Sequence, residues 1–355
     1  MLNESCLVKT CKPSIMFTRV PEVDLSDPEA KSLIIKASKE CGFFKVVQHG
    51  VAFELITNLE NEVLRFFHQP QPQKDKVVPP DPCGYGSRKI GANGDEGWLE
   101  YLLINTNPDD PKSLHLFQQN PANFRSAVED YIGAVKNLCS DVLELMADGL
   151  GVEPRNVFSR LTMDERSDCL LRVNRYPVCA ELDEFEALSE QYLIGFGEHT
   201  DPQIISVLRS NNSHGLQICL RDGTWASIPP DQTSFFVIVG DLLQVMTNGR
   251  FKSVKHRVLT DSTISRISII YFGGPPLNEN IAPLPSLVLK EEESLYKELT
   301  WQEYKTATFK SRLSDNRLRL FEKFPSTLKP PSSLLLSLTP DAESRIATLR
   351  PLSSL

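Results

Sequence analysis

The stretch Gly197-Glu198-His199-Thr200-Asp201 decides how this sequence is interpreted, together with His256 much later in the chain. His199 and Asp201 are two positions apart, so in an extended segment their side chains project from the same face. His256 lies in a second segment with strand character. Two imidazoles and one carboxylate on one side of an ion leave its other side open, which is the ligand set of non-haem Fe(II) sites. The spacing therefore predicts a metal centre formed by His199, Asp201 and His256.

An accidental surface pair of a histidine and an aspartate is the alternative explanation of this pattern, and its surroundings argue against it. Small and aromatic residues precede His199, and an apolar strand follows Asp201. A third predicted strand carries Arg266 and Ser268 on one face. Because the neighbours of Arg266 are apolar, a surface arginine is not expected there. We therefore favour the metal interpretation and count Arg266 among the catalytic residues.

The bulk properties are those of a soluble globular protein. The 355 residues suffice for a substantial core, and the net charge of −8 without a long basic run argues against nucleic acid or an anionic membrane as a partner. The eight cysteines include no CxxC pair, which is typical of reduced, intracellular cysteines. No segment has the apolar length of a signal peptide or a membrane span, so we expect a cytoplasmic location. The sequence does not indicate an oligomeric state.

Two different patterns of apolar residues, one in each half of the chain, predict an α+β fold. Helical spacing of apolar residues dominates the first half, above all from Pro121 to Gly149, whereas short β-rich runs separated by turns begin after Asp168. Such runs are typical of a double-stranded β-helix, or jelly roll, here with an N-terminal helical region and C-terminal helices. The expected segments are a flexible N-terminus (1–15), the helical region (16–160), the jelly roll (161–276), the C-terminal helices (277–325) and a disordered tail (326–355).

Two segments of the chain bear on a substrate cavity. Residues 70–97 are rich in proline and glycine, which predicts a long loop, and such loops often act as lids or binding segments. The following predicted strand contains Trp98 and Tyr101. These are either core residues or, with Phe272, an apolar wall for a hydrophobic substrate.

The predicted strand 169–177 alternates, so Arg172, Asn174 and Tyr176 share one face. An asparagine and a tyrosine that point together into a barrel can donate hydrogen bonds to a carboxylate. The planar guanidinium of Arg266 can hold a carboxylate by paired, charge-assisted hydrogen bonds. These residues predict a binding site for an anionic small molecule.

The set Asn174-x-Tyr176, His199-x-Asp201, His256 and Arg266-x-Ser268 resembles the plant soluble 2-oxoglutarate and Fe(II)-dependent dioxygenases, over about residues 16 to 325. Longer stretches are similar to gibberellin 2-beta-dioxygenases, of the type that acts on C19 gibberellins. These stretches are 94–103, 195–203, 248–257 and 271–276.

The resemblance implies a set of roles and a reaction. Fe(II) would bind His199, Asp201 and His256. The distal carboxylate of 2-oxoglutarate would bind Arg266, Ser268 and Tyr176, with Asn174 near the metal-bound end. The reaction would consume O2, release succinate and CO2, and hydroxylate a gibberellin at carbon 2 on the β face, which inactivates the hormone. Ascorbate is the implied reductant.

Two alternatives stay open at this point. The same iron machinery could act on another plant metabolite, such as a C20 gibberellin precursor or a flavonoid. The jelly roll could also bind a small molecule without turnover, although the complete set of metal and cosubstrate residues argues against this. The spacing of residues does not indicate which side chain anchors the substrate's own carboxylate.

Overall fold

The computed structural model describes most of the chain, namely residues 10–11, 14–17, 19–77, 83–90, 93–107, 109–179, 192–261, 263–288 and 294–323. The expected disordered tail, 326–355, lies outside the described residues, as does most of the expected flexible N-terminus, 1–15. Among the helices that are described, none combines the length and the apolar character needed to cross a membrane.

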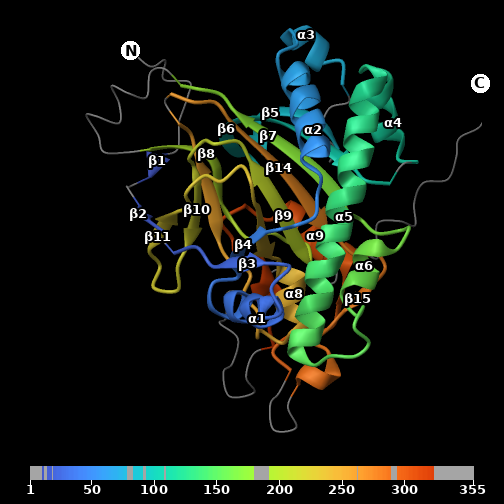
Figure 1. Ribbon diagram of the computed structural model, residues 1–355, viewed down its shortest axis with the longest axis vertical. Helices are drawn as coiled ribbons and strands as arrows, with labels where there is room; N and C mark the ends of the chain where they lie inside the picture. The colour runs from blue at the N-terminus through green and yellow to red at the C-terminus, as the bar shows by residue number, and fades with distance from the viewer. Residues whose placement is uncertain are drawn as a thin grey trace, which may run out of the picture.

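Two facing β-sheets form the centre of the described structure (Figure 1). The larger sheet contains, in spatial order, β3 (Glu22–Asp24), β4 (Phe43–Val47), β12 (Phe235–Val239), β9 (Ile205–Ser210), β14 (Arg266–Gly273), β7 (Leu170–Tyr176), β6 (Asp95–Asn105) and β5 (Gly84–Ile90). The smaller sheet contains β1 (Thr10–Cys11), β8 (Tyr192–His199), β13 (His256–Leu259), β10 (Leu216–Cys219), β11 (Trp225–Ser227) and β2 (Ile15–Met16). The predicted α+β jelly roll is confirmed.

Apolar side chains on the two sides of the larger sheet form two separate cores. The inner core lies between the sheets, where Leu208 and Phe236 of the larger sheet meet Leu216 and Ile218 of the smaller one. The outer core lies between the larger sheet and the helices. Because side chains alternate along each strand, every strand of the larger sheet except β3 contributes to both cores.

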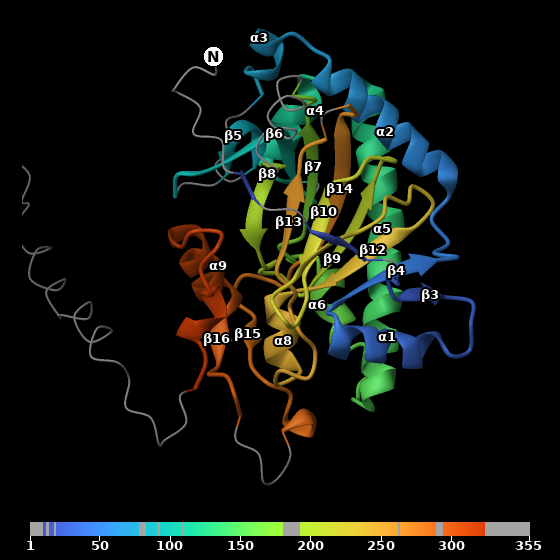
Figure 2. The same cartoon turned by 90° about the vertical axis from the view of Figure 1, so that its left-hand side faces the viewer.

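The helices cover the outer face of the larger sheet (Figure 1). They are α1 (Ala30–Glu40), α2 (Phe53–Phe67), α3 (Gln71–Lys74), α4 (Pro111–Gln118), α5 (Ala122–Leu150) and α6 (Ser159–Met163). Two later helices, α8 (Asp241–Met246) and α9 (Trp301–Lys310), lie at the lower end of the sheets instead (Figure 2). The longest is α5, whose periodic apolar residues pack on β9 and β14 and on its neighbours α1 and α2. It ends at Gly151, which adopts a left-handed conformation with φ 65°.

The expectation of a long loop over residues 70–97 is wrong for the described part of that segment. Residues 71–74 form α3, and β5 pairs with β6 in an antiparallel hairpin. The glycines serve close packing here, because a Cβ at Gly86 would lie 2.4 Å from the ring of Tyr101 on the neighbouring strand. The expected helical region therefore also supplies β3, β4, β5 and β6 to the larger sheet.

The C-terminal part of the chain closes one end of the space between the sheets. A capping box begins α9, in which the Thr300 backbone N–H donates to Glu303 at 2.7 Å, as the sequence predicted. The second expected C-terminal helix is a short 3-10 turn, Arg317–Leu320, and the strands β15 (Asn280–Ile281) and β16 (Leu299–Thr300) pair beside α9. Figure 2 shows α9 next to the ends of β8 and β13.

Candidate metal centre and active site

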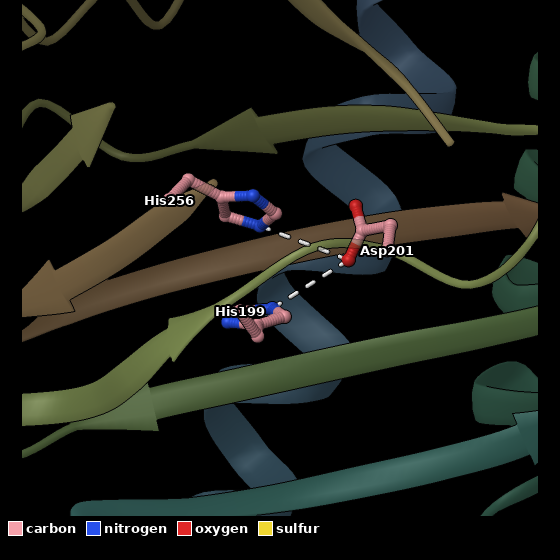
Figure 3. A group of neighbouring side chains, drawn as sticks. All are labelled: His199, Asp201 and His256. Atoms are coloured by element: carbon pink, nitrogen blue, oxygen red, sulfur yellow. Dashed lines mark ion pairs between the residues drawn. The ribbon is translucent and has the colours of Figure 1, made fainter. Parts of the chain in front are cut away.

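The side chains of His199, Asp201 and His256 converge on one point between the two sheets (Figure 3). His199 ends β8 and lies directly opposite His256, the first residue of the neighbouring strand β13. The Oδ1 atom of Asp201 is 3.5 Å from His199 Nε2 and 3.7 Å from His256 Nε2. One ligand atom from each residue can be chosen so that all lie within 4.8 Å of one another.

The hydrogen bonds of the two imidazoles leave their Nε2 atoms available to a metal ion. His199 Nδ1 is 2.8 Å from the Gly197 carbonyl oxygen, and His256 Nδ1 is 3.2 Å from the Val254 carbonyl oxygen. Because a carbonyl oxygen can only accept, each Nδ1 carries the proton and each Nε2 has a free lone pair. A backbone carbonyl that fixes the tautomer in this way is a common support of metal-binding histidines.

Charge at the centre also suits a cation. Burial alone would raise the pKa of Asp201, but the charges of His256 and His199 and a 2.6 Å hydrogen bond from Ser206 hold that pKa well below its usual range. Burial and the nearby His199 lower the pKa of His256 to about 4. One carboxylate and two imidazoles therefore meet at this centre, which is the donor set of a non-haem Fe(II) site.

A second cluster of polar side chains lies on the adjacent strands β14 and β7. Arg266 pairs with Tyr176 across the two strands, and Ser268 pairs with Asn174. These four predicted site residues are buried, and Arg266 is 2% exposed. A glycine at position 195 makes room for the tyrosine, because a Cβ there would lie 2.6 Å from its ring.

The Arg266 guanidinium has unused hydrogen-bonding capacity. One Nη atom donates to the Ser213 carbonyl oxygen at 2.6 Å, whereas Nε is buried without a partner among the described residues. No carboxylate in the described part of the chain forms an ion pair with it. Burial lowers its pKa to about 10, so it remains charged at neutral pH. A buried cation of this kind fits the carboxylate of a bound acid.

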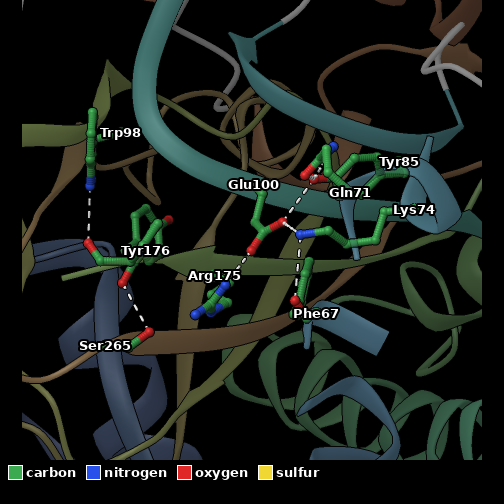
Figure 4. Close-up of polar contacts among 10 residues, drawn as sticks. Phe67, Gln71, Lys74, Tyr85, Trp98, Glu100, Arg175, Tyr176 and Ser265 are labelled. Carbon is green, nitrogen blue, oxygen red and sulfur yellow. Dashed lines mark hydrogen bonds and ion pairs between the residues drawn. The ribbon is translucent and has the colours of Figure 1, made fainter. Parts of the chain in front are cut away.

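A cavity of about 540 Å³ joins the metal centre to Asn174, Tyr176 and Ser268 of this polar group. Arg266, which pairs with Tyr176, is not among the residues that line it. Tyr101 and Phe272, two of the three predicted wall residues, line it. Trp98 does not, because the alternation of β6 directs it to the opposite side from Tyr101. Its indole N–H instead donates to the Pro177 carbonyl oxygen at 3.0 Å (Figure 4).

The side of β6 and β7 away from the cavity carries a compact charge cluster, which we call the Glu100 cluster (Figure 4). Glu100 accepts from Lys74 at 2.6 Å, from Arg175 at 2.6 Å and from the Tyr85 hydroxyl at 2.8 Å. Burial raises the pKa of Glu100, but these hydrogen bonds outweigh burial and the net shift is downward. The cluster ties α3 and β5 to the strands that form the cavity wall.

Sequence reasoning missed several polar residues of the cavity. Arg172 lines it, although only its place on the same face as Asn174 and Tyr176 was noted from the alternation. Ser206, which donates to Asp201, gave no signal because its role depends on a contact between strands. Lys305 of α9 also lines the cavity, and its Nζ is paired with both oxygens of Asp168 at 2.9 and 2.6 Å.

Comparison with known proteins matches this geometry to one family. Residues 167–275 match the 2OG-Fe(II) oxygenase superfamily, and residues 13–123 match the N-terminal region of non-haem dioxygenases in morphine synthesis. A gibberellin 2-beta-dioxygenase of Phaseolus coccineus is 64% identical over 324 residues, which cover 91% of this chain and 96% of that protein. The chain belongs to the gibberellin 2-beta-dioxygenase family. Gibberellin 2-beta-dioxygenase 2 of Arabidopsis thaliana is a further member, 55% identical over 91% of this chain and 94% of its own length.

Solved structures agree with this membership at the level of the fold. A crystal structure of JOX2 in complex with 2OG, Fe and JA has a TM-score of 0.74 and 28% identity, with coverage of 86% of this chain and 89% of that one. The predicted enzyme class and the predicted dependence on Fe(II) and 2-oxoglutarate are therefore confirmed for the gibberellin 2-beta-dioxygenase family to which this chain belongs.

Proposed function

We propose that this chain hydroxylates C19 gibberellins at carbon 2 on the β face, with Fe(II) and 2-oxoglutarate, and thereby inactivates the hormone. The observation that carries the proposal is one cavity lined both by His199, Asp201 and His256 and by Asn174, Tyr176 and Ser268. The buried Arg266 pairs with Tyr176 across β14 and β7. The choice of a gibberellin as substrate is supported by the names of relatives that are 53–64% identical.

The three converging residues would hold Fe(II) through His199 Nε2, Asp201 Oδ1 and His256 Nε2. Ser206 contributes by occupying the other oxygen of Asp201, at 2.6 Å, so that Oδ1 is the oxygen directed toward the imidazoles. A ligand set on one side leaves room for the cosubstrate on the other.

Arg266 would hold the distal carboxylate of 2-oxoglutarate with charge-assisted hydrogen bonds, aided by the hydroxyl groups of Ser268 and Tyr176. Asn174 lies two residues from Tyr176 on the same face of β7 and would donate a hydrogen bond toward the metal-bound end of 2-oxoglutarate. When bound, iron and 2-oxoglutarate supply an O2-dependent oxidation in which 2-oxoglutarate becomes succinate and CO2 and one oxygen atom enters a substrate C–H bond. Ascorbate would serve as the reductant that keeps the iron ferrous.

The apolar part of the cavity would orient the substrate and exclude water. Tyr101 and Leu103 from β6, Phe272 from β14 and Phe309 from α9 lie on its wall. A mostly apolar wall suits the polycyclic skeleton of a gibberellin, and a fixed orientation is what selects a single C–H bond.

Incubation of the purified chain with Fe(II), 2-oxoglutarate and a panel of C19 gibberellins, C20 precursors and flavonoids tests the proposal. Mass spectrometry should find 2-beta-hydroxylated C19 gibberellins as the preferred products. A preference for a C20 precursor or a flavonoid would support the alternative that the same iron machinery acts on another plant metabolite. Binding of a gibberellin without Fe(II)-dependent succinate release would instead support a non-catalytic binding protein.

A cytoplasmic location is part of the same proposal. It is supported by the free thiols of Cys41, Cys83, Cys139, Cys169 and Cys219, which fit a reducing compartment. Fractionation of cells that express a tagged chain tests it, with the soluble cytoplasmic fraction as the expected result.

A further inference from the structure

Arg172 is a half-buried arginine on the cavity wall. Its Nε donates to Asn174 Oδ1 at 2.7 Å, and one of its Nη atoms is buried without a hydrogen-bond partner among the described residues. In the described part of the chain, no carboxylate forms an ion pair with it. Its guanidinium lies 4.0 Å from the centre of the Tyr101 ring and 5.0 Å from that of Phe196.

A cation held partly out of water without a counter-ion carries a desolvation cost, and part of that cost is recovered when an anion binds. Burial accordingly lowers the pKa of Arg172. Attraction to the two aromatic faces offsets part of the cost and holds the guanidinium in place. An Nη without a hydrogen-bond partner, on a guanidinium held in this way, is suited to a carboxylate.

The other cations on the cavity wall are less suited to a substrate anion. Lys305 is already paired with Asp168. Arg317 is buried and its Nε also has no partner among the described residues, but it donates to the Thr200 carbonyl oxygen. It also faces the Asp241 carboxyl, whose pKa is raised by burial and lowered in part by the Arg317 charge. Lys89 is exposed at the rim. Arg266 is needed for 2-oxoglutarate under the proposed function.

We propose that Arg172 binds the carboxylate of the substrate and so selects apolar molecules that carry one carboxylate. This inference rests on the proposed function, because a gibberellin supplies both the carboxylate and an apolar polycyclic body. The ring of Phe196 lies against Arg172 and is 4.6 Å from the ring of His199. A carboxylate held by Arg172 therefore places the attached ring system one aromatic ring away from the metal centre.

Binding of a C19 gibberellin and of its methyl ester to the enzyme tests this, measured by calorimetry without O2 and with Fe(II) and 2-oxoglutarate present. Esterification removes the charge and keeps the ring system. Wild type should bind the free acid about 10- to 100-fold more tightly than the ester, the usual effect of a charge-assisted hydrogen bond. Arg172→Met should bind both forms equally, and Arg172→Lys should restore part of the preference.

Arg175→Met is the matched control, because this arginine lies on the same strand, β7, and faces the Glu100 cluster instead of the cavity. It should keep the wild-type preference for the acid. Equal binding of acid and ester by wild type, or an undiminished preference in Arg172→Met, overturns the inference. If Arg172→Met does not fold, Arg172→Gln replaces it in the same comparison.

Two further results separate this inference from the proposed function and from a purely structural role. Tight binding of the acid without 2-hydroxylation would contradict the proposed function and leave the assignment of Arg172 intact. If neither ligand binds to wild type, both are overturned. A raised KM for 2-oxoglutarate in Arg172→Met, with the preference for the acid intact, would mean that Arg172 merely positions Asn174.

Discussion

The two faces of β7 carry arginines in opposite electrostatic situations. On the outer face, Arg175 is paired with Glu100 at 2.6 Å, and Lys74 shares the same carboxylate. On the cavity face, Arg172 has no carboxylate partner in the described structure, and neither does Arg266 on the adjacent strand. Arg172 and Arg175 are both half-buried, so burial alone does not distinguish them. The difference indicates that the outer cluster is complete without a ligand, whereas the cavity face is completed by bound acids.

The largest expected effect is a loss of turnover that occurs when a residue of the metal centre is replaced and not when a residue of the Glu100 cluster is. His199→Ala removes one metal ligand, so succinate release that depends on Fe(II) and substrate should fall to background. Glu100→Gln, on the outer face, should retain turnover in the fraction that is folded. Succinate formation and circular dichroism, measured on the same samples, check both. Wild-type turnover in His199→Ala would contradict the assignment of the metal centre.

The next largest effect is the loss of stability when the Glu100 cluster is broken. Glu100→Gln leaves Lys74 and Arg175 without their buried counter-ion, so the free energy of unfolding in urea should fall by about 3–5 kcal/mol. Glu129→Gln is the control, because its ion pair with Arg125 is 44–45% exposed and should contribute about 0–1 kcal/mol. Equal losses in the two variants would mean that the Glu100 cluster is not a structural unit.

Replacement of Arg266, which has no carboxylate partner in the described structure, should weaken cosubstrate binding without loss of stability. Arg266→Met should raise the KM for 2-oxoglutarate about 10- to 100-fold, because the charge-assisted hydrogen bonds to the distal carboxylate are lost. Without ligands, the free energy of unfolding should be unchanged or higher, since a buried charge without a counter-ion has been replaced by an apolar side chain. Kinetics at varied 2-oxoglutarate and urea unfolding measure the two quantities. A variant with normal KM and reduced stability would place Arg266 with the structural residues.

The smallest effect is the pH dependence of the Glu100 cluster. Because the folded protein lowers the pKa of Glu100, the unfolded chain binds the proton more readily. The stabilisation is therefore present above the ordinary glutamate pKa of about 4.3 and is lost as the pH falls through the lower folded value. The difference in stability between wild type and Glu100→Gln should shrink below about pH 4. A difference that is constant from pH 7 to pH 3 would contradict this account.

The sequence predicted those features that depend on periodicity and short spacing. The pair His199 and Asp201, the partner strand with His256 and the long helix α5 all follow from local patterns. Alternation within 169–177 also placed Asn174 and Tyr176 on one face, and the structure pairs them with Ser268 and Arg266. Their role in binding the cosubstrate stays a prediction. The names of the relatives agree with the family resemblance that these motifs suggested.

Features that depend on contacts between distant segments could not be predicted. The composition of residues 70–97 suggested a loop, whereas part of this segment forms β5. Gly86 allows β5 to pack against the Tyr101 ring, which a Cβ at this position would contact too closely. Trp98 was a candidate for either the core or the cavity wall. Its position relative to the cavity depends on how β6 pairs with β7, which the sequence alone does not reveal. Alternation placed Arg172 on the cavity face, but whether a carboxylate lies opposite it is decided by the whole fold.

The ratio of succinate to hydroxylated gibberellin, measured with purified chain, Fe(II), 2-oxoglutarate and a C19 gibberellin, tests the central claim most directly. The account predicts one succinate for each 2-beta-hydroxylated gibberellin, and neither product from His199→Ala. Succinate formed without a hydroxylated gibberellin, or a hydroxyl group at a different carbon, would contradict it.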